Sequence, residues 1–211
     1  LERVFEINRS FRNEGVSIKH NPEFTMLEVY AAYANFESMM HLCESLIVSI
    51  AQEIFGTLEF TYQGKSLNFT PPWKRVSFAE LVKERFGIQP QDSGELMLEK
   101  LKKAGFAKDK DKLSRTQINK VIEETLEADM SINPTFVTDY FTVFCPLAKT
   151  RPDNPLISER FELFIAGMEV GNAYSELNDP FEQKVRFEEE VKDPGESGEK
   201  SVDDDYVLAL E

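Results

Sequence analysis

The sequence predicts an α+β protein: a mostly antiparallel sheet, flanked by helices and carrying a helical insertion. Three observations support this fold class. Apolar and polar residues alternate near the amino terminus, apolar residues recur at helical spacing through the middle of the chain, and strand-forming residues dominate a run near the carboxyl terminus. With 211 residues the chain is long enough for one domain with a sizeable core.

The first two predicted strands span residues 1–12 and 24–34, where apolar and polar residues alternate. The turn signals Asn-Glu-Gly and Asn-Pro lie between them, so we expect an antiparallel hairpin with a long loop. Because side chains alternate along a strand, four residues of the second strand share one face. They are Phe24, Met26, Glu28 and Tyr30.

A helix is expected at 35–55, with Asn35 as its cap and Gly56 after its last turn. Residues 58–69 predict a hairpin around Gln63-Gly64-Lys65. Three further helices are expected near 77–86, 93–105 and 114–128, with capping boxes that begin at Ser77 and Ser114.

The last third of the chain is predicted to return to the sheet. Short strands are expected at 136–140 and 142–144, a loop at 150–154 and one long strand at 160–174. Asp179 and Pro180 begin a helix that runs to about residue 191, and a further helix can start near 202. The chain therefore divides into a first part of the core (1–72), a helical insertion (73–130) and a second part of the core with an acidic end (131–211).

The net charge of −14 argues against a chain that grips nucleic acid by itself, since such proteins present a basic face. Ten acidic residues and two lysines fall between 188 and 211, which predicts a solvated, mobile loop there. No apolar run reaches membrane-spanning length and no signal peptide is present, so we expect a cytoplasmic protein without a membrane partner. Cys43 and Cys145 lack metal-binding spacing and are expected to be reduced thiols.

The segment from Glu162 to Asp179 places three carboxylates, Glu162, Glu169 and Glu176, in an apolar setting. A buried carboxylate is costly unless it meets a cation or hydrogen-bond donors, so these residues suggest a site for a metal ion, an amine or both. An antiparallel strand with one wet face explains them equally well from this segment alone.

Three stretches resemble the class II aminoacyl-tRNA synthetases, in the form found in lysyl-tRNA synthetases. FRNEG and HNPEFTMLEVY, within residues 11–30, resemble motif 2 of that family. FELFIAGMEVGNAYSELNDP, at 161–180, resembles the segment before motif 3, and PTFVTDY with PLAK, within 134–149, also resembles the family. The resemblance is strong over about 1–70 and 130–190. It implies that lysine is activated by ATP and Mg²⁺ to lysyl-adenylate and transferred to tRNA(Lys), by a homodimer that holds tRNA mostly outside this chain.

The resemblance also implies a role for each matched residue. Arg12 is the expected catalytic residue, which holds the α-phosphate and the substrate carboxylate. The residues expected to bind ATP are Arg12, Glu14, His20, Phe24, Glu162 and Glu169. Glu162 and Glu169 are also the expected Mg²⁺ ligands. The residues expected to bind lysine are Glu28, Tyr30, Asn172, Tyr174 and Glu176.

This assignment makes a geometric demand on the strand at 160–174. Glu162 and Glu169 are seven residues apart, so a regular strand would place them on opposite faces. Bulges at Gly167 and Gly171 are expected to bring them together with Asn172. A perfectly regular strand, or Glu28 and Glu176 on opposite sides of the sheet, would count against the shared site.

By the resemblance, motif 1 and the anticodon-binding domain would precede Leu1 and motif 3 would follow Glu211, so we expect this polypeptide alone not to form lysyl-adenylate at a useful rate. Two alternatives remain open. One is the related lysyl ligase that modifies elongation factor P, which Gly171 and the 73–130 insertion disfavour. The other is a non-catalytic binding module on the same fold, for which we would expect the matched residues to be lost.

Overall fold

A computed structural model describes residues 1–13, 16, 20–192 and 201–211. The chain forms two compact units, Leu1–Asn35 and Phe36–Glu211, and each is described by itself. The predicted three-part division at residues 72 and 130 stays a prediction.

The first unit is the predicted antiparallel hairpin. Strand β1 (Arg3–Phe11) pairs with β2 (Glu23–Ala31) so that Glu6 lies opposite Glu28. Phe24, Met26 and Glu28 of β2 lie opposite Ser10, Asn8 and Glu6 of β1. Because side chains alternate, Phe24 and Glu28, which are both expected in the site, lie on the same face of this hairpin.

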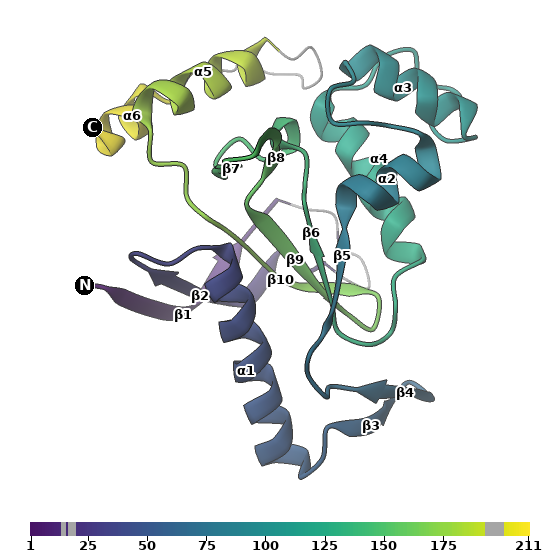
Figure 1. Ribbon diagram of the computed structural model, residues 1–211, viewed down its shortest axis with the longest axis vertical. Coiled ribbons are helices and arrows are strands. Elements are labelled where there is room, and N and C mark those ends of the chain that lie inside the picture. The colour runs from purple at the N-terminus through teal and green to yellow at the C-terminus, as the bar shows by residue number, and fades with distance from the viewer. Residues whose placement is uncertain (14–15, 17–19, 193–200) are drawn as a thin grey trace. The chain divides into compact units, whose positions relative to one another are not determined.

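The second unit is built on a four-stranded sheet in the order β10-β9-β6-β5 (Figure 1). Its strands are β5 (Lys74–Ser77), β6 (Thr135–Thr138), β9 (Arg160–Ile165) and β10 (Met168–Tyr174). The pairs β6–β9 and β9–β10 are antiparallel and β5–β6 is parallel, which agrees with the predicted mostly antiparallel sheet.

One predicted strand is in fact two. The run at 160–174 turns back on itself between β9 and β10, where Ala166 and Gly167 have φ values of 55° and 73°. Two successive residues with positive φ form the tight turn that suits the twist of a hairpin. The expectation of a single long strand with a bulge at Gly167 is therefore wrong, and this glycine serves the turn.

Helix α1 (Phe36–Phe55) covers one face of the sheet. Its buried residues Phe36 and Met40 pack with Trp73, Phe136 and Phe161. The first turn is joined to the sheet by a hydrogen bond of 3.0 Å, which the Phe36 amide donates to the Ser175 hydroxyl.

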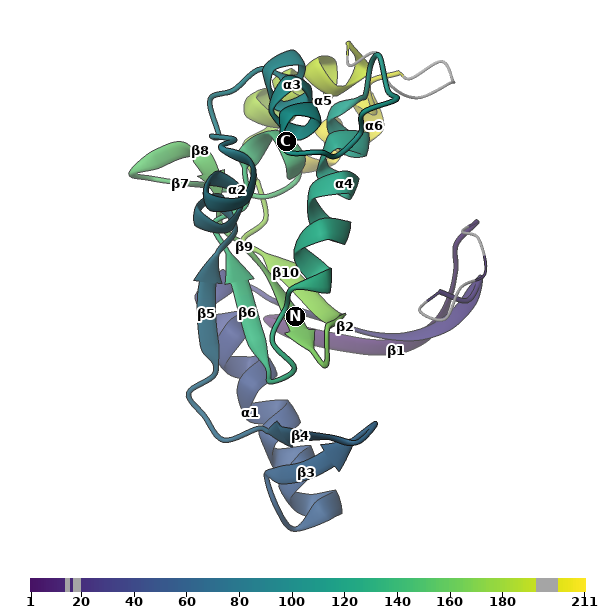
Figure 2. The ribbon, with the colours of Figure 1, turned by 90° about the vertical axis from the view of Figure 1, so that its right-hand side faces the viewer.

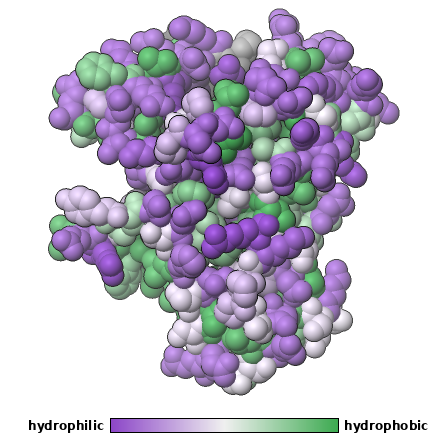
Figure 3. Space-filling model, viewed as in Figure 1, coloured by the Kyte–Doolittle hydropathy of each residue, from purple (hydrophilic) through white to green (hydrophobic). Residues whose placement is uncertain are grey.

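Figure 3 shows a largely hydrophilic face with hydrophobic residues exposed between the polar ones.

Three helices lie between β5 and β6 in the chain: α2 (Phe78–Phe86), α3 (Gly94–Lys103) and α4 (Arg115–Ala128). Their apolar residues form one core with Val137 of β6 and Phe164 of β9, and α4 runs alongside the sheet while α2 and α3 lie beyond its end (Figure 2). Alternation explains the two faces, because the neighbouring residues Phe136 and Leu163 belong to the α1 side. The capping box predicted at Ser114 is confirmed, and Ser77 caps α2.

Smaller elements complete the second unit. The hairpin of β3 (Glu59–Tyr62) and β4 (Lys65–Asn68) is confirmed, as is helix α5 (Pro180–Val191), and α6 (Asp204–Leu210) follows. Residues 142–144 form a 3-10 helix, η1 (Thr142–Phe144), where a strand was expected. The expected loop at 150–154 is part of a hairpin. Its strands β7 (Thr150–Arg151) and β8 (Asn154–Ser158) pair with each other.

Other features bear on the bulk predictions. The acidic loop predicted at the carboxyl end falls partly on 193–200, outside the described residues. Cys43 and Cys145 are both free thiols, as expected. In the described parts of the chain, no helix combines the length and the apolar character needed to cross a membrane.

Candidate functional site

The β9–β10 hairpin brings together three residues that the sequence assigned to the site. Asn172 lies directly opposite Glu162, and Glu169 lies opposite Phe164. The register shifts between Glu169 and Gly171, so one residue is extra on β10. Glu162, Glu169 and Asn172 consequently share one face, and the bulge expected at Gly171 is confirmed.

Glu162 is buried, with 3% of its surface exposed, and both of its carboxylate oxygens accept a hydrogen bond. The Tyr140 hydroxyl donates to Oε2 at 2.6 Å, and Nη2 of Arg160 donates to Oε1. Burial raises the pKa of Glu162 to about 7, against the opposing effects of the Arg160 charge and the Tyr140 hydroxyl. The negative charge of Glu169 also raises the pKa.

Two further carboxylates lie near Glu162. Glu169 is exposed at the rim of the hairpin and accepts a hydrogen bond of 2.9 Å from the Asn172 amide. Glu123, on α4, is half-buried and accepts one of 2.7 Å from Asn119. Burial raises the pKa of Glu123, and the charge of Glu169 contributes to that shift, so α4 adds a third acidic group to this face of the sheet.

The donor set suits a magnesium ion that is shared with phosphates. Among the described residues, no group of three or more His, Cys, Asp or Glu is arranged to hold a metal ion. Mg²⁺ is commonly bound by only one or two carboxylates, and substrate phosphates and water complete its coordination. Glu162 and Glu169, on one face of one hairpin, fit that pattern.

The end of β10 positions the remaining predicted residues of this unit. Tyr174 lies opposite Arg160, on the same face as Glu162, and packs against the hydrophobic core to which α4 contributes. Ser175 points the other way, toward α1. Glu176 follows the strand and forms a bridge with Ala148, and partial burial raises its pKa.

Three predicted residues of the first unit, Phe24, Glu28 and Tyr30, share one face of the β1–β2 hairpin. The Arg12 guanidinium lies over the Phe24 ring, 5.4 Å from its centre. The Glu28 carboxylate accepts hydrogen bonds from Asn8 at 3.1 Å and from the Tyr30 hydroxyl at 3.3 Å. His20 is exposed in the connection between the strands, and Glu14 lies outside the described residues. The meeting of Glu28 with Glu176 stays a prediction, since the two units are described separately.

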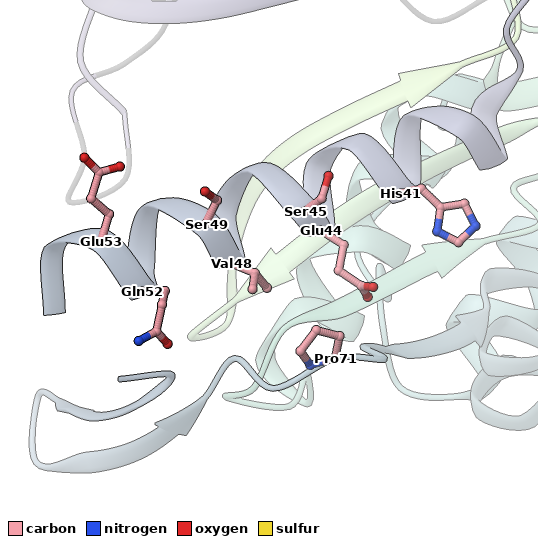
Figure 4. Close-up of a pocket in the computed structure, with 8 residues that line it drawn as sticks. All are labelled: His41, Glu44, Ser45, Val48, Ser49, Gln52, Glu53 and Pro71. Carbon is pink, nitrogen blue, oxygen red and sulfur yellow. The ribbon is translucent and has the colours of Figure 1, made fainter. Parts of the chain in front are cut away.

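A groove of the second unit contains none of these residues. It has a volume of about 820 Å³ and lies between α1 and Pro71, with His41 and Glu53 near its two ends (Figure 4). Glu44 lines it and accepts a hydrogen bond of 2.8 Å from the Trp73 amide. His41 is exposed here.

Sequence reasoning missed four residues around Glu162: Tyr140, Arg160, Glu123 and Asn119. Arg160 had a signal, because it stands two residues before Glu162 and so points to the same face of a strand. Tyr140 ends the quoted PTFVTDY stretch, but nothing in the sequence shows that its hydroxyl reaches Glu162. Glu123 and Asn119 belong to the insertion, and no local pattern connects that helix to β9.

Comparison with known proteins decides the family. The family described as tRNA synthetases class II (D, K and N) matches residues 1–211. This chain belongs to that family. The resemblance seen in motif 2 and in the segment before motif 3 is thereby confirmed.

Several relatives in this class II synthetase family match the whole chain. Lysine–tRNA ligase of Thermotoga maritima is 44% identical over 214 residues, which is 100% of this chain and 42% of the relative. The enzymes of the same name from Pelotomaculum thermopropionicum and Nostoc punctiforme are 45% and 46% identical over the whole chain and 43% and 38% of their own lengths. The chain thus spans about two fifths of the length of these relatives.

Proposed function

We propose that the enzyme carrying this chain is a lysine–tRNA ligase. It activates lysine with ATP, releases pyrophosphate, and transfers the lysyl group to tRNA(Lys). The observation that carries the proposal is the shared face of the β9–β10 hairpin, where Glu162, Glu169 and Asn172 lie together. Relatives named lysine–tRNA ligase, at 44% to 46% identity over the whole chain, support the choice of lysine.

Activation requires an in-line attack of the lysine carboxylate on the α-phosphate, which depends on positioning and charge stabilisation. Arg12 would hold the α-phosphate and the attacking carboxylate through its planar fork of donors. Phe24, which already lies beneath the Arg12 guanidinium, would stack on the adenine ring. His20 would contact the outer phosphates, and Glu14 would accept a hydrogen bond from the adenine amino group.

Glu162 and Glu169 would hold Mg²⁺ against the ATP phosphates. When bound, the ion would neutralise the charge that develops on the phosphates. Asn172 would keep Glu169 in place through the hydrogen bond between the two side chains. The buried Glu162 would provide a fixed ligand, and the exposed Glu169 one that adjusts to the nucleotide.

The lysine side chain would be recognised by acidic and hydroxyl groups. An ammonium group offers three donors and one positive charge, and Glu28, Glu176 and the two tyrosines, Tyr30 and Tyr174, are suitable acceptors for it. Asn172 would complete this pocket. The acidic lining disfavours an aspartate substrate, because a substrate carboxylate would meet like charges.

Amino acid-dependent exchange of pyrophosphate into ATP by the full-length protein tests this proposal. We expect lysine to support exchange and aspartate or asparagine to give none above background. Exchange with aspartate or asparagine but not lysine would contradict the proposal within the same family. A protein that activates lysine but charges elongation factor P in place of tRNA would move the assignment to the related ligase.

The 211-residue chain by itself is expected to exchange pyrophosphate far more slowly than the full-length protein, since it covers only 42% of the length of a relative such as the Thermotoga maritima enzyme. Robust lysine-dependent exchange by the isolated chain would refute this expectation. We extend the proposal to a homodimeric enzyme, which sedimentation of the full-length protein would check.

A further inference from the structure

We propose that Arg160 and Tyr140 are positioning residues that fix the Glu162 carboxylate in the orientation needed for the metal–nucleotide complex. This inference rests on the proposed function, in which Glu162 is a Mg²⁺ ligand. We call Arg160, Tyr140, Cys145 and Glu162 the Glu162 clamp. Of these four residues, only Glu162 has a part in the proposed binding of lysine or ATP.

The clamp holds the carboxylate at two points. Arg160 donates to Oε1 of Glu162, and the Tyr140 hydroxyl donates to Oε2. A carboxylate oxygen has two acceptor directions, so each oxygen retains one for a cation after these bonds are made. Two donors on two different oxygens also prevent rotation of the carboxylate plane. Glu162 is therefore held in one orientation without having its capacity as a ligand used up.

Arg160 is itself held in place. Its guanidinium lies 4.9 Å from the centre of the Tyr140 ring, and Nη1 donates to the Cys145 sulfur at 3.2 Å. Only 18% of the Arg160 side chain and 4% of the Glu162 side chain are exposed. Tyr140 therefore acts twice, as a donor to Glu162 through its hydroxyl and as a platform for Arg160 through its ring.

A purely structural ion pair is the competing explanation, and the chain contains a comparable but more exposed example. Arg151 pairs with Asp139 at 2.5 Å and lies 5.6 Å from the centre of the Phe36 ring. This arrangement also combines an arginine, a carboxylate and an aromatic ring, but Asp139 is not a predicted ligand. Substitution of Arg151, whose side chain is 33% exposed, thus removes a partly buried arginine whose carboxylate partner is Asp139 and not Glu162.

The test measures Mn²⁺ binding to the full-length protein by electron paramagnetic resonance, in the presence of a non-hydrolysable ATP analogue. Partners that orient a metal ligand typically contribute about 10- to 100-fold in metal affinity, and we expect R160M to lose about that much. R160K should recover part of the loss, because it keeps the charge but not the planar fork. Y140F should lose less Mn²⁺ affinity than R160M, because it keeps the ring that supports Arg160. The Mn²⁺ affinity of R151M should stay within about twofold of wild type.

Two accompanying measurements separate positioning from stability. Thermal unfolding should show a loss of melting temperature in R160M at least as large as that in R151M, because the Arg160 pair is the more buried of the two. Calorimetry should show lysine affinity without nucleotide within about twofold of wild type for R160M. Wild-type Mn²⁺ affinity in R160M, or equal losses in R160M and R151M, would overturn the positioning role. If R160M does not fold, wild-type affinity in both R160K and Y140F would overturn it. Failure of the wild-type protein to bind Mn²⁺ with the analogue would overturn the proposed function itself and this role with it.

Discussion

At the scale of single residues, Glu162 shows how a carboxylate can be placed inside a protein. Its transfer from water is costly, and burial raises its pKa to about 7. Arg160 and Tyr140 offset part of that cost by supplying one donor to each oxygen. Breaking such a pair is expensive because the remaining charge stays buried without its partner.

The substitution E162A is therefore expected to lower the free energy of unfolding by about 3–5 kcal/mol, the range seen when a buried ion pair loses one member. E169A should cost less than about 0.5 kcal/mol, since Glu169 is exposed. Urea denaturation at pH 8, above the pKa of Glu162, measures both. Similar values for the two variants would show that the Glu162 clamp does not stabilise the second unit.

At the scale of elements, the β9–β10 hairpin decides which side chains share a face. The turn at Ala166–Gly167 reverses the chain, and the bulge between Glu169 and Gly171 corrects the alternation. The two glycines have different tasks. Gly167 needs its positive φ of 73°, whereas a Cβ on Gly171 would meet nothing within 4 Å.

This difference makes the two glycines a matched pair. G167A should destabilise the protein by about 1–2 kcal/mol, because an L residue in the left-handed region is strained. G171A should change the free energy of unfolding by less than about 0.5 kcal/mol. Urea denaturation of both variants under the same conditions tests the assignment of turn and bulge. A larger cost for G171A than for G167A would contradict it.

At the scale of the whole molecule, sequence patterns predicted most helices and strands, but not which of them lie next to each other in the fold. Periodicity and capping residues located α1, α4 and α5 to within a residue or two. The run at 160–174 misled because Ala-Gly is a weak turn signal and both arms of the hairpin are strand formers. The residues around Glu162 were partly hidden, since Glu123 lies about forty positions away in sequence and only folding brings it close.

The proposed function requires Glu28 and Glu176 to bind the same lysine ammonium group. A double-mutant cycle on Glu28 and Glu176, read by calorimetric lysine binding to the full-length protein, tests this claim directly. We expect E28Q and E176Q each to weaken binding about 10-fold or more, as for hydrogen bonds to a charged group. In the double variant the two losses should differ from additivity by more than about 0.5 kcal/mol, because the residues share a partner. Unchanged lysine affinity in either single variant, or strictly additive losses, would contradict the shared pocket.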